Sequence, residues 1–262
     1  MKTPLKPKMQ VVKSWGYGLV SVSVFVLGVL LLDIDSAGFI ERLGRFGSIV
    51  RQFLVLDFAF FGVLMDGMLT SIMLSLISLV LGGFIALALS FLAASNITPS
   101  AVLSAGIKGF VSLIRAIPSL IWALMVIASF GFGNIGGVIT LMISSIGFLT
   151  KAFTTAIEDA GDDIIEALRA TGAPWILIVI KGLIPTVITA IITWFAVRGE
   201  SSVSESISLG IIGVAGIGFT LTRSIARFQY GQITLGVLII FATMFTLELA
   251  TQGLKKRLRK SE

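Results

Sequence analysis

The sequence predicts an all-α, polytopic transmembrane protein. Of its 262 residues, 56% are hydrophobic and 13% are charged, whereas charged residues make up about a quarter of an ordinary soluble domain. The mean hydropathy is +1.02. Several apolar stretches have the length that crosses a bilayer, and one long polar interruption, residues 154–185, divides them. The expected fold is therefore a bundle of membrane helices that holds one polar element in place.

The composition also excludes several kinds of chemistry. The chain has no Cys and no His, so disulfides, thiol nucleophiles and imidazole ligands are not available. We therefore expect no catalytic residue and no metal site. The net charge of +6 gathers at the two ends of the chain, which indicates membrane topology and not nucleic-acid binding.

The first part of the chain is expected to be a basic cytoplasmic tail, residues 1–14, followed by a first span at residues 15–32. A cleaved signal peptide is the alternative, but the run is long for a signal core and no small-residue cleavage site precedes Asp33. Residues 33–66 mix acids, arginines and bulky apolar side chains, which predicts an amphipathic segment at the outer interface. Residues 15–66 thus form one region before the main transmembrane domain, residues 67–252.

In the main domain, a second span is expected at residues 67–94 and a break at residues 96–99. The segment 99–130 is too long for one span, and Pro118 predicts a kink or a restart within it. The glycine-rich stretch 131–137 lacks the Lys-Ser/Thr of a phosphate-binding loop and has no flanking strand, so we interpret it as a tight outer turn.

Residues 138–153 are expected to return to the cytoplasm and to lead into an amphipathic helix at about residues 155–172. On a helical wheel its apolar residues fall on one side and its acids on the other. Five acids near its start suit the positive end of a helix dipole, and Gly172 followed by Pro174 is a stop signal. The pattern fits either a solvated surface helix or a docking element for another protein.

The last part of the domain contains a span at residues 183–197, a glycine-rich segment at 207–227 and a final span at 233–249. The glycines of the middle segment allow helices or a re-entrant segment to approach closely, or they serve packing alone; they are Gly210, Gly213, Gly216 and Gly218. A basic cytoplasmic tail follows at residues 253–262. Five or six crossings are possible, and six is favoured because it leaves both termini in the cytoplasm.

The polar interruption resembles the cytoplasmic signature of permease subunits of bacterial ABC importers, which reads Glu-Ala-Ala, three residues, Gly, nine residues, Ile-x-Leu-Pro. Glu166, Ala167 and Leu168 stand in its first three positions, Gly172 follows at the matching distance, and Pro185 ends it. Leu168 replaces the second Ala, and Gly182 and Ile184 replace the Ile and Leu of the ending. The sequences at 169–173, 181–185 and 210–218 are similar to the phosphonate permease branch, although methionine-type permeases carry a similar glycine run.

The resemblance covers about residues 66–256 and implies a type I ABC importer permease fold in the bacterial inner membrane. It implies two copies of this chain, two ABC ATPase subunits, and an external binding protein that delivers phosphonate, phosphite or a related oxyanion. The chain has no P-loop motif, so ATP and Mg would bind the partner ATPase. The residues implied in ATPase coupling are Asp162, Asp163, Glu166, Ala167, Arg169, Gly172 and Pro185.

An anionic cargo predicts positive charge along its path. A charge within a membrane protein is costly, so a buried arginine is usually functional or paired. The candidates are Arg115, Arg198, Arg223 and Arg227, with Glu200 and Glu205 as possible partners of Arg198, while Lys151 and Lys181 are expected to snorkel to the inner interface.

Three other functions are kept as alternatives. One is a permease for methionine or another small solute. An ion-coupled secondary transporter would need acids at mid-membrane, and the sequence suggests only Glu248 within an apolar run. A membrane enzyme would have few nucleophile and base pairs without His and Cys.

Overall fold

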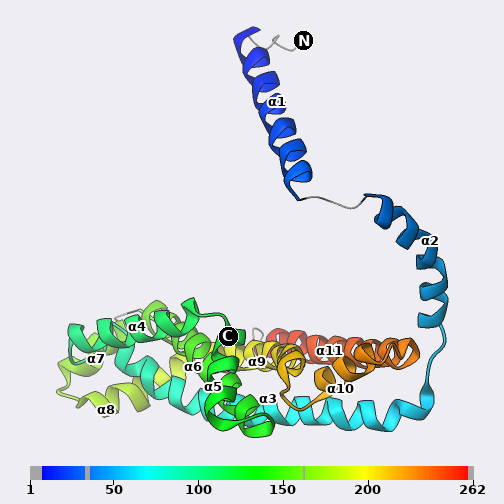
Figure 1. Cartoon of the computed structure of the whole chain (residues 1–262). Coiled ribbons are helices and arrows are strands. Elements are labelled where there is room, and N and C mark those ends of the chain that lie inside the picture. Colours follow the sequence, from blue (N-terminus) through cyan, green and yellow to red (C-terminus); the bar gives the residue numbers. More distant parts are fainter. Residues whose placement is uncertain (1–7, 33–35, 162, 259–262) are drawn as a thin grey trace. The chain divides into compact units, whose positions relative to one another are not determined.

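The computed structural model describes residues 8–32, 36–161 and 163–258, and all regular elements in these ranges are helices (Figure 1). This confirms the all-α prediction. The chain divides into two units, residues 1–52 and residues 53–262. They are described separately below.

The first unit contains α1, Lys8–Leu31, and most of α2, Ser36–Phe53. The apolar run of α1 is Trp15–Leu31, 17 residues, which is about 25 Å of helix and the short end of what crosses a bilayer. Helix α2 has the separated polar and apolar sides of the predicted interfacial segment. Asp33 and Asp35 of that prediction lie outside the described residues.

The second unit is a bundle of membrane-length and shorter helices. Its long helices are α3, Phe61–Ala93, α6, Asn134–Asp159, α9, Ile184–Leu209, and α11, Tyr230–Leu258. Its shorter elements are η1, Phe58–Phe60, α4, Ala101–Ala116, α5, Ser119–Phe130, α7, Asp163–Ala170, α8, Trp175–Leu177, the π-helix η2, Ile178–Leu183, η3, Gly210–Ile212, and α10, Ile217–Ala226.

Small polar residues let α3, α6 and α9 pack closely. Ser75 Oγ of α3 donates a hydrogen bond to the carbonyl O of Ser202 of α9 at 2.9 Å. Ser78 Oγ, one turn further along α3, donates to the carbonyl O of Val138 of α6 at 3.0 Å. Lipid tails give helices no hydrophobic reason to associate, so such close contacts and hydrogen bonds hold a membrane bundle together.

Fewer stretches of the described chain reach membrane length than the six crossings predicted from the sequence. Four stretches of the described chain are long and apolar enough to cross a membrane, or five if α4 and α5, which meet at 91°, form one span. The shorter run of α1 would be a sixth. The break before Ser119 lies at Pro118, as the sequence predicts.

Two predicted boundaries are wrong. The outer turn is shorter than residues 131–137, because only Gly131 and Gly133 have positive φ, +82° and +119°, and α6 begins at Asn134. The span predicted at 183–197 continues to Leu209, because Arg198, Ser202 and Ser206 are buried inside the bundle and do not end the helix.

The glycine-rich segment turns sharply after α9. Helix α10 has only 10 residues, about 15 Å, so it does not by itself reach across a bilayer. A Cβ on Gly218 would overlap the carbonyl O of Ile207, and one on Gly210 would overlap the backbone of Gly218. Gly216 has φ +132°, and the next amide, of Ile217, donates to Ser71 Oγ at 3.2 Å. These glycines therefore permit backbone contact within the turn and with α3.

We expect Gly218→Ala to lower the thermal unfolding midpoint of the purified protein in detergent, because the new methyl would meet backbone atoms that cannot move aside. Gly106→Ala is the matched control. A Cβ there has no atom within 4 Å, so its midpoint should stay the same or rise slightly. Equal midpoints for the two variants would contradict the close backbone approach at Gly218.

Candidate functional site

The predicted amphipathic helix consists of two pieces. Helix α6 continues to Asp159, Gly161 adopts φ +82°, and α7 begins at Asp163. The single helix expected at about 155–172 is therefore wrong, because a left-handed Gly161 interrupts it. Glu158 and Asp159 belong to the end of α6, and Asp162 lies outside the described residues.

Helix α7 packs its apolar side on the bundle. Ile165 is 1% exposed and joins a core cluster with Ile178 and Leu183 of η2. Leu168 also packs on this cluster, and a Cβ on Gly182 of η2 would contact the Leu168 side chain. Two residues expected on this side, Ile164 and Ala167, are exposed instead. Helix α7 thus rests directly on the π-helix that leads into α9.

The outer side of α7 carries the predicted coupling residues. The exposed ones are Asp163, Glu166, Ala167, Arg169 and Gly172. Gly172 has φ +75°, and the amide of Ala173 donates to the carbonyl O of Leu168 at 3.2 Å, so the predicted stop after α7 is confirmed. Pro185 is also exposed, but it lies in the first turn of α9, beyond η2.

A loop at residues 94–100 holds α7 and the end of α6 in place, which the sequence did not suggest. Arg169 Nη2 donates to the carbonyl O of Asn96 at 3.2 Å, and Trp175 Nε1 donates to that of Ile97 at 2.8 Å. The amide of Ser95 in this loop donates to Glu158 Oε1 of α6 at 2.8 Å, and Lys108 of α4 pairs with the same oxygen at 2.8 Å. These contacts join residues 50 to 78 positions apart in sequence, so no local pattern could reveal them.

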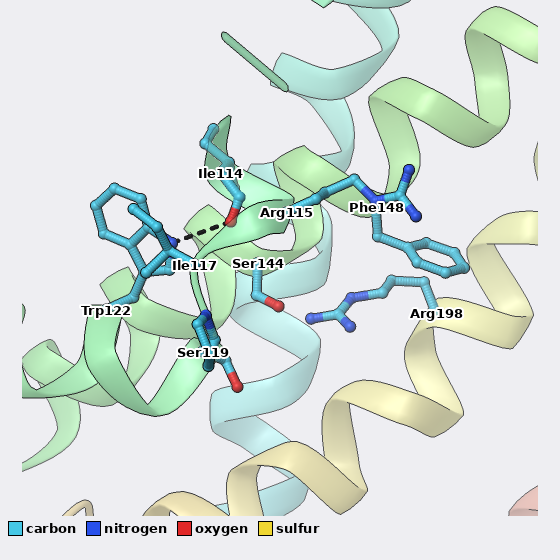
Figure 2. Close-up of a pocket in the computed structure, with 9 residues that line it drawn as sticks. Ile114, Arg115, Ile117, Ser119, Trp122, Ser144, Phe148 and Arg198 are labelled. Atoms are coloured by element: carbon cyan, nitrogen blue, oxygen red, sulfur yellow. Dashed lines mark hydrogen bonds between the residues drawn. The ribbon is translucent and has the colours of Figure 1, made fainter. Parts of the chain in front are cut away.

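A second feature is a pocket of about 230 Å³ between α4, α5, α6 and α9, which we call the arginine pocket (Figure 2). Arg115 and Arg198 both line it, together with Ser119, Ser144 and Phe148. The indole Nε1 of Trp122, which also lines it, donates to the carbonyl O of Ile114 at 3.1 Å across the bend between α4 and α5. Two predicted path residues therefore meet at one site.

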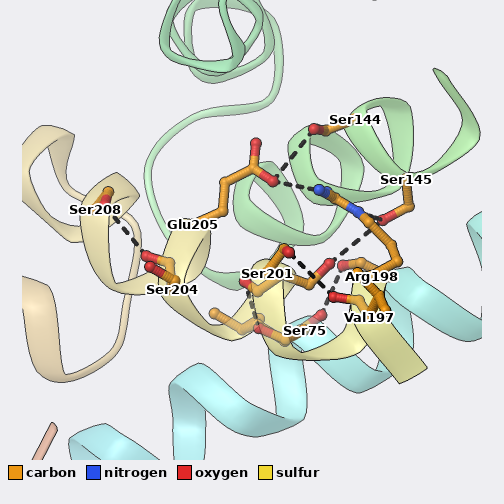
Figure 3. Close-up of polar contacts among 12 residues, drawn as sticks. Ser75, Ser144, Ser145, Val197, Arg198, Ser201, Ser204, Glu205 and Ser208 are labelled. Atoms are coloured by element: carbon orange, nitrogen blue, oxygen red, sulfur yellow. Dashed lines mark hydrogen bonds and ion pairs between the residues drawn. The ribbon is translucent and has the colours of Figure 1, made fainter. Parts of the chain in front are cut away.

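Arg198 is buried within the bundle, only 6% exposed, and not at the end of a span as predicted. Its Nη2 lies 2.6 Å from Glu205 Oε2, and its Nε donates to Ser145 Oγ at 3.1 Å (Figure 3). Ser144 Oγ donates to the same Glu205 oxygen at 3.2 Å. Glu205 is the partner and Glu200 makes no ion pair with Arg198 among the described residues. Arg198 and Glu205 are seven residues apart, which is about two helical turns, so they lie on the same side of α9. This spacing is the feature of the sequence that indicates the ion pair.

The sequence suggested Glu248 as the only acid within a membrane span, and the structure shows that this expectation is wrong. Glu248 is exposed, whereas Glu205 is the acid inside the bundle, with a side chain 15% exposed. It is tied to Arg198 and Ser144, so it is not a free carboxylate.

The remaining predicted arginines lie elsewhere. Arg223 and Arg227 line a separate pocket of about 190 Å³, with Gln229 and Gln232, near the start of α11. Arg115 is exposed and has no ion pair or hydrogen bond from its side chain to any described residue. The four candidates thus form two sites and not one continuous row.

Comparisons with known proteins agree on the kind of chain. The family described as binding-protein-dependent transport system inner membrane component matches residues 86–261. The phosphite transport system permease protein PtxC of Stutzerimonas stutzeri is 26% identical over 241 residues, which cover 92% of this chain and 86% of that protein. The phosphate-import permease protein PhnE of Mycolicibacterium smegmatis is 31% identical over 183 residues, 69% of this chain but only 34% of that protein.

A solved structure shares the fold. A chain of the MetNI methionine ABC transporter in an inward-facing conformation superposes with a TM-score of 0.69 at 19% identity. The match covers 78% of this chain and 99% of that one. At this identity the likeness concerns the fold alone.

We expect Glu205→Gln to destabilise the protein by about 3 kcal/mol, because it leaves the buried Arg198 charge without its counter-ion. Glu200→Gln in the same helix is the control and should have little effect, since Glu200 has no ion pair among the described residues. Unfolding in detergent, followed by circular dichroism, measures both. Similar losses in the two variants would mean that the ion pair does not stabilise the bundle.

Proposed function

This chain belongs to the family of binding-protein-dependent transport system inner membrane components, and we propose that it forms an import path for phosphonate, phosphite or a related oxyanion. As a permease subunit of an ABC importer, it is a transport subunit and not an enzyme. The observation that carries the cargo proposal is the meeting of Arg115 and Arg198 at one pocket between α4, α5, α6 and α9.

The proposal includes the partners of the chain. Two copies would form the path, two ATPase subunits would bind ATP and Mg and dock on α7, and an external binding protein would deliver the cargo. Both termini would lie in the cytoplasm of a bacterium, at the inner membrane. The basic residues in the last turn of α11, Lys255, Lys256 and Arg257, support that placement of the C-terminus.

The contacts of α7 support its role as the coupling element. Its acids, Asp163 and Glu166, are exposed and accessible to a partner protein. Its apolar residues Ile165 and Leu168 pack against η2. The π-helix η2 runs directly into α9, the helix that carries Arg198. A shift of α7 against the bundle would therefore reach the arginine pocket along one continuous helical segment.

The charge of the arginine pocket supports an anionic cargo. Glu205 neutralises Arg198, so the uncompensated positive charge at this site belongs to Arg115. A single net charge attracts an oxyanion without holding it so strongly that release fails. The names of two relatives, a phosphite permease and a phosphate-import permease, point to the same class of cargo.

The two transport alternatives are less well supported. A methionine permease rests on a shared fold at 19% identity, and the two arginines in the wall of the arginine pocket favour an anion over a thioether side chain. A secondary transporter would need a free acid at mid-membrane, and the buried acid, Glu205, is engaged by Arg198.

We expect Glu166→Lys and Gly172→Val to reduce ATP hydrolysis stimulated by cargo-loaded binding protein. The first reverses a charge on the exposed side of α7, and the second forces a β-branched residue into a left-handed conformation. Gly253→Val, at a helical position with no atom within 4 Å of its Cβ, is the control. If coupled ATPase activity were intact in both variants, α7 would not be the docking element.

We expect Arg115→Gln to lower oxyanion uptake into proteoliposomes at least about tenfold, because a charge-assisted hydrogen bond to the cargo would be lost. Arg115→Lys keeps the charge and should retain part of the uptake. Lys255→Gln removes an exposed charge that lies outside the arginine pocket and serves as the control. Normal uptake by Arg115→Gln would exclude Arg115 from the path.

A further inference from the structure

A smaller pocket of about 100 Å³ lies between α4, α6 and the end of α3, and we call it the threonine pocket. The lining residues that matter here are Lys108, Ser112, Arg115, Thr150, Lys151 and Thr154. Arg115 lines this pocket and the arginine pocket, so its side chain lies between the two. Lys108 lies seven residues before Arg115, and Lys151 seven residues after Ser144, which is about 10 Å along each helix toward the end that carries α7.

The threonine pocket is strongly basic. Three of its lining residues are cations, and only Lys108 has an acidic partner among the described residues, Glu158 at 2.8 Å. Lys151, expected from the sequence to snorkel to the interface, is exposed and makes no ion pair with the described chain. Arg115 and Lys151 therefore leave two positive charges uncompensated around a small cavity.

Two buried hydroxyls beside these charges lack hydrogen-bond partners. Thr150 is 1% exposed and Thr154 is 3% exposed, and the Oγ1 of each has no partner among the described residues. Other helical threonines satisfy this atom locally: Thr140, Thr193 and Thr222 each donate to the carbonyl four residues earlier. Thr150 and Thr154 are one turn apart on α6, so their side chains share one side of that helix.

These features suit a ligand that is small, anionic and rich in hydrogen-bond acceptors. Rotation about χ1 moves the hydroxyl of a threonine to another staggered position, so either hydroxyl can turn to the pocket when an acceptor arrives. A cavity of this size holds a few waters or one small ion, and is well below the roughly 300 Å³ at which pockets for larger organic ligands begin. The acids nearby do not compete, since Glu158 is engaged by Lys108.

We propose that the threonine pocket is a binding site for a phosphorus oxyanion, held by the charges of Lys151 and Arg115 and by the hydroxyls of Thr150 and Thr154. The oxyanion has two possible sources with the same chemistry: free phosphate or phosphonate in solution, and the headgroup of an anionic lipid. The site requires only this chain. It would exist even if the chain imported another solute, so its test is independent of the transport proposal.

The test uses the full chain in nanodiscs of phosphatidylcholine, with inorganic phosphate or methylphosphonate as the probe. Phosphate should raise the thermal unfolding midpoint of the native chain, and Lys151→Gln should weaken the apparent affinity at least about tenfold. Thr150→Val should raise the midpoint without phosphate, because it removes an unpaired buried hydroxyl, and should reduce the phosphate-dependent rise. Controls are Lys181→Gln and Thr186→Val; Thr186 donates to the carbonyl of Gly182 and is outside the pocket.

A second arm replaces part of the phosphatidylcholine by phosphatidylglycerol. A rise in the midpoint with phosphatidylglycerol alone, lost in Lys151→Gln but kept in Lys181→Gln, would identify the lipid headgroup as the source. A rise with free phosphate or methylphosphonate, lost in the same variant, would identify the soluble anion. The proposal is overturned if neither raises the midpoint, or if Lys151→Gln and Thr150→Val respond like their controls.

Discussion

The structure depends on the close packing of α3, α6 and α9 through small residues. Ser75 and Ser78 of α3 donate hydrogen bonds to backbone carbonyls of α9 and α6, and Gly83 accommodates the ring of Phe195 of α9. Larger side chains at these positions would separate the helices, because in lipid the association rests on van der Waals contact and interhelical hydrogen bonds. The contact also determines where the polar groups of α6 and α9 meet, and so it determines the site.

The buried ion pair depends on this packing. Arg198 reaches Glu205 on its own helix and Ser145 on α6, so the pair tolerates its burial only while the two helices stay close. Phe148 of α6 lies against the same guanidinium, 5.8 Å from ring centroid to Cζ. A change in the packing of α9 on α6 would therefore alter the charge presented to the arginine pocket. Helix α7 packs on the π-helix η2, and η2 continues directly into α9.

The sequence predicted the class of fold, the bend at Pro118 and the stop at Gly172, since hydropathy, proline and glycine act locally. It failed where a helix contains polar residues that face protein. Arg198 and Glu205 looked like the end of a span, yet they satisfy each other inside α9. It failed also at Gly161, where a wheel drawn through residues 155–172 hid a break. The threonine pocket could not be predicted from the sequence, because its residues come from three helices that meet only in the folded bundle.

We propose that nucleotide bound to a partner ATPase controls access to the arginine pocket through α7 and η2. The chain has no cysteine, so Ser144→Cys, in the wall of that pocket, would be its single thiol. The most direct measurement is the rate at which a membrane-impermeant maleimide labels this thiol from each side of the membrane in the assembled transporter. We expect the side from which the thiol is labelled to change between the nucleotide-free state and the state trapped with ATP and vanadate. Labelling from the same side at the same rate in both states would contradict it.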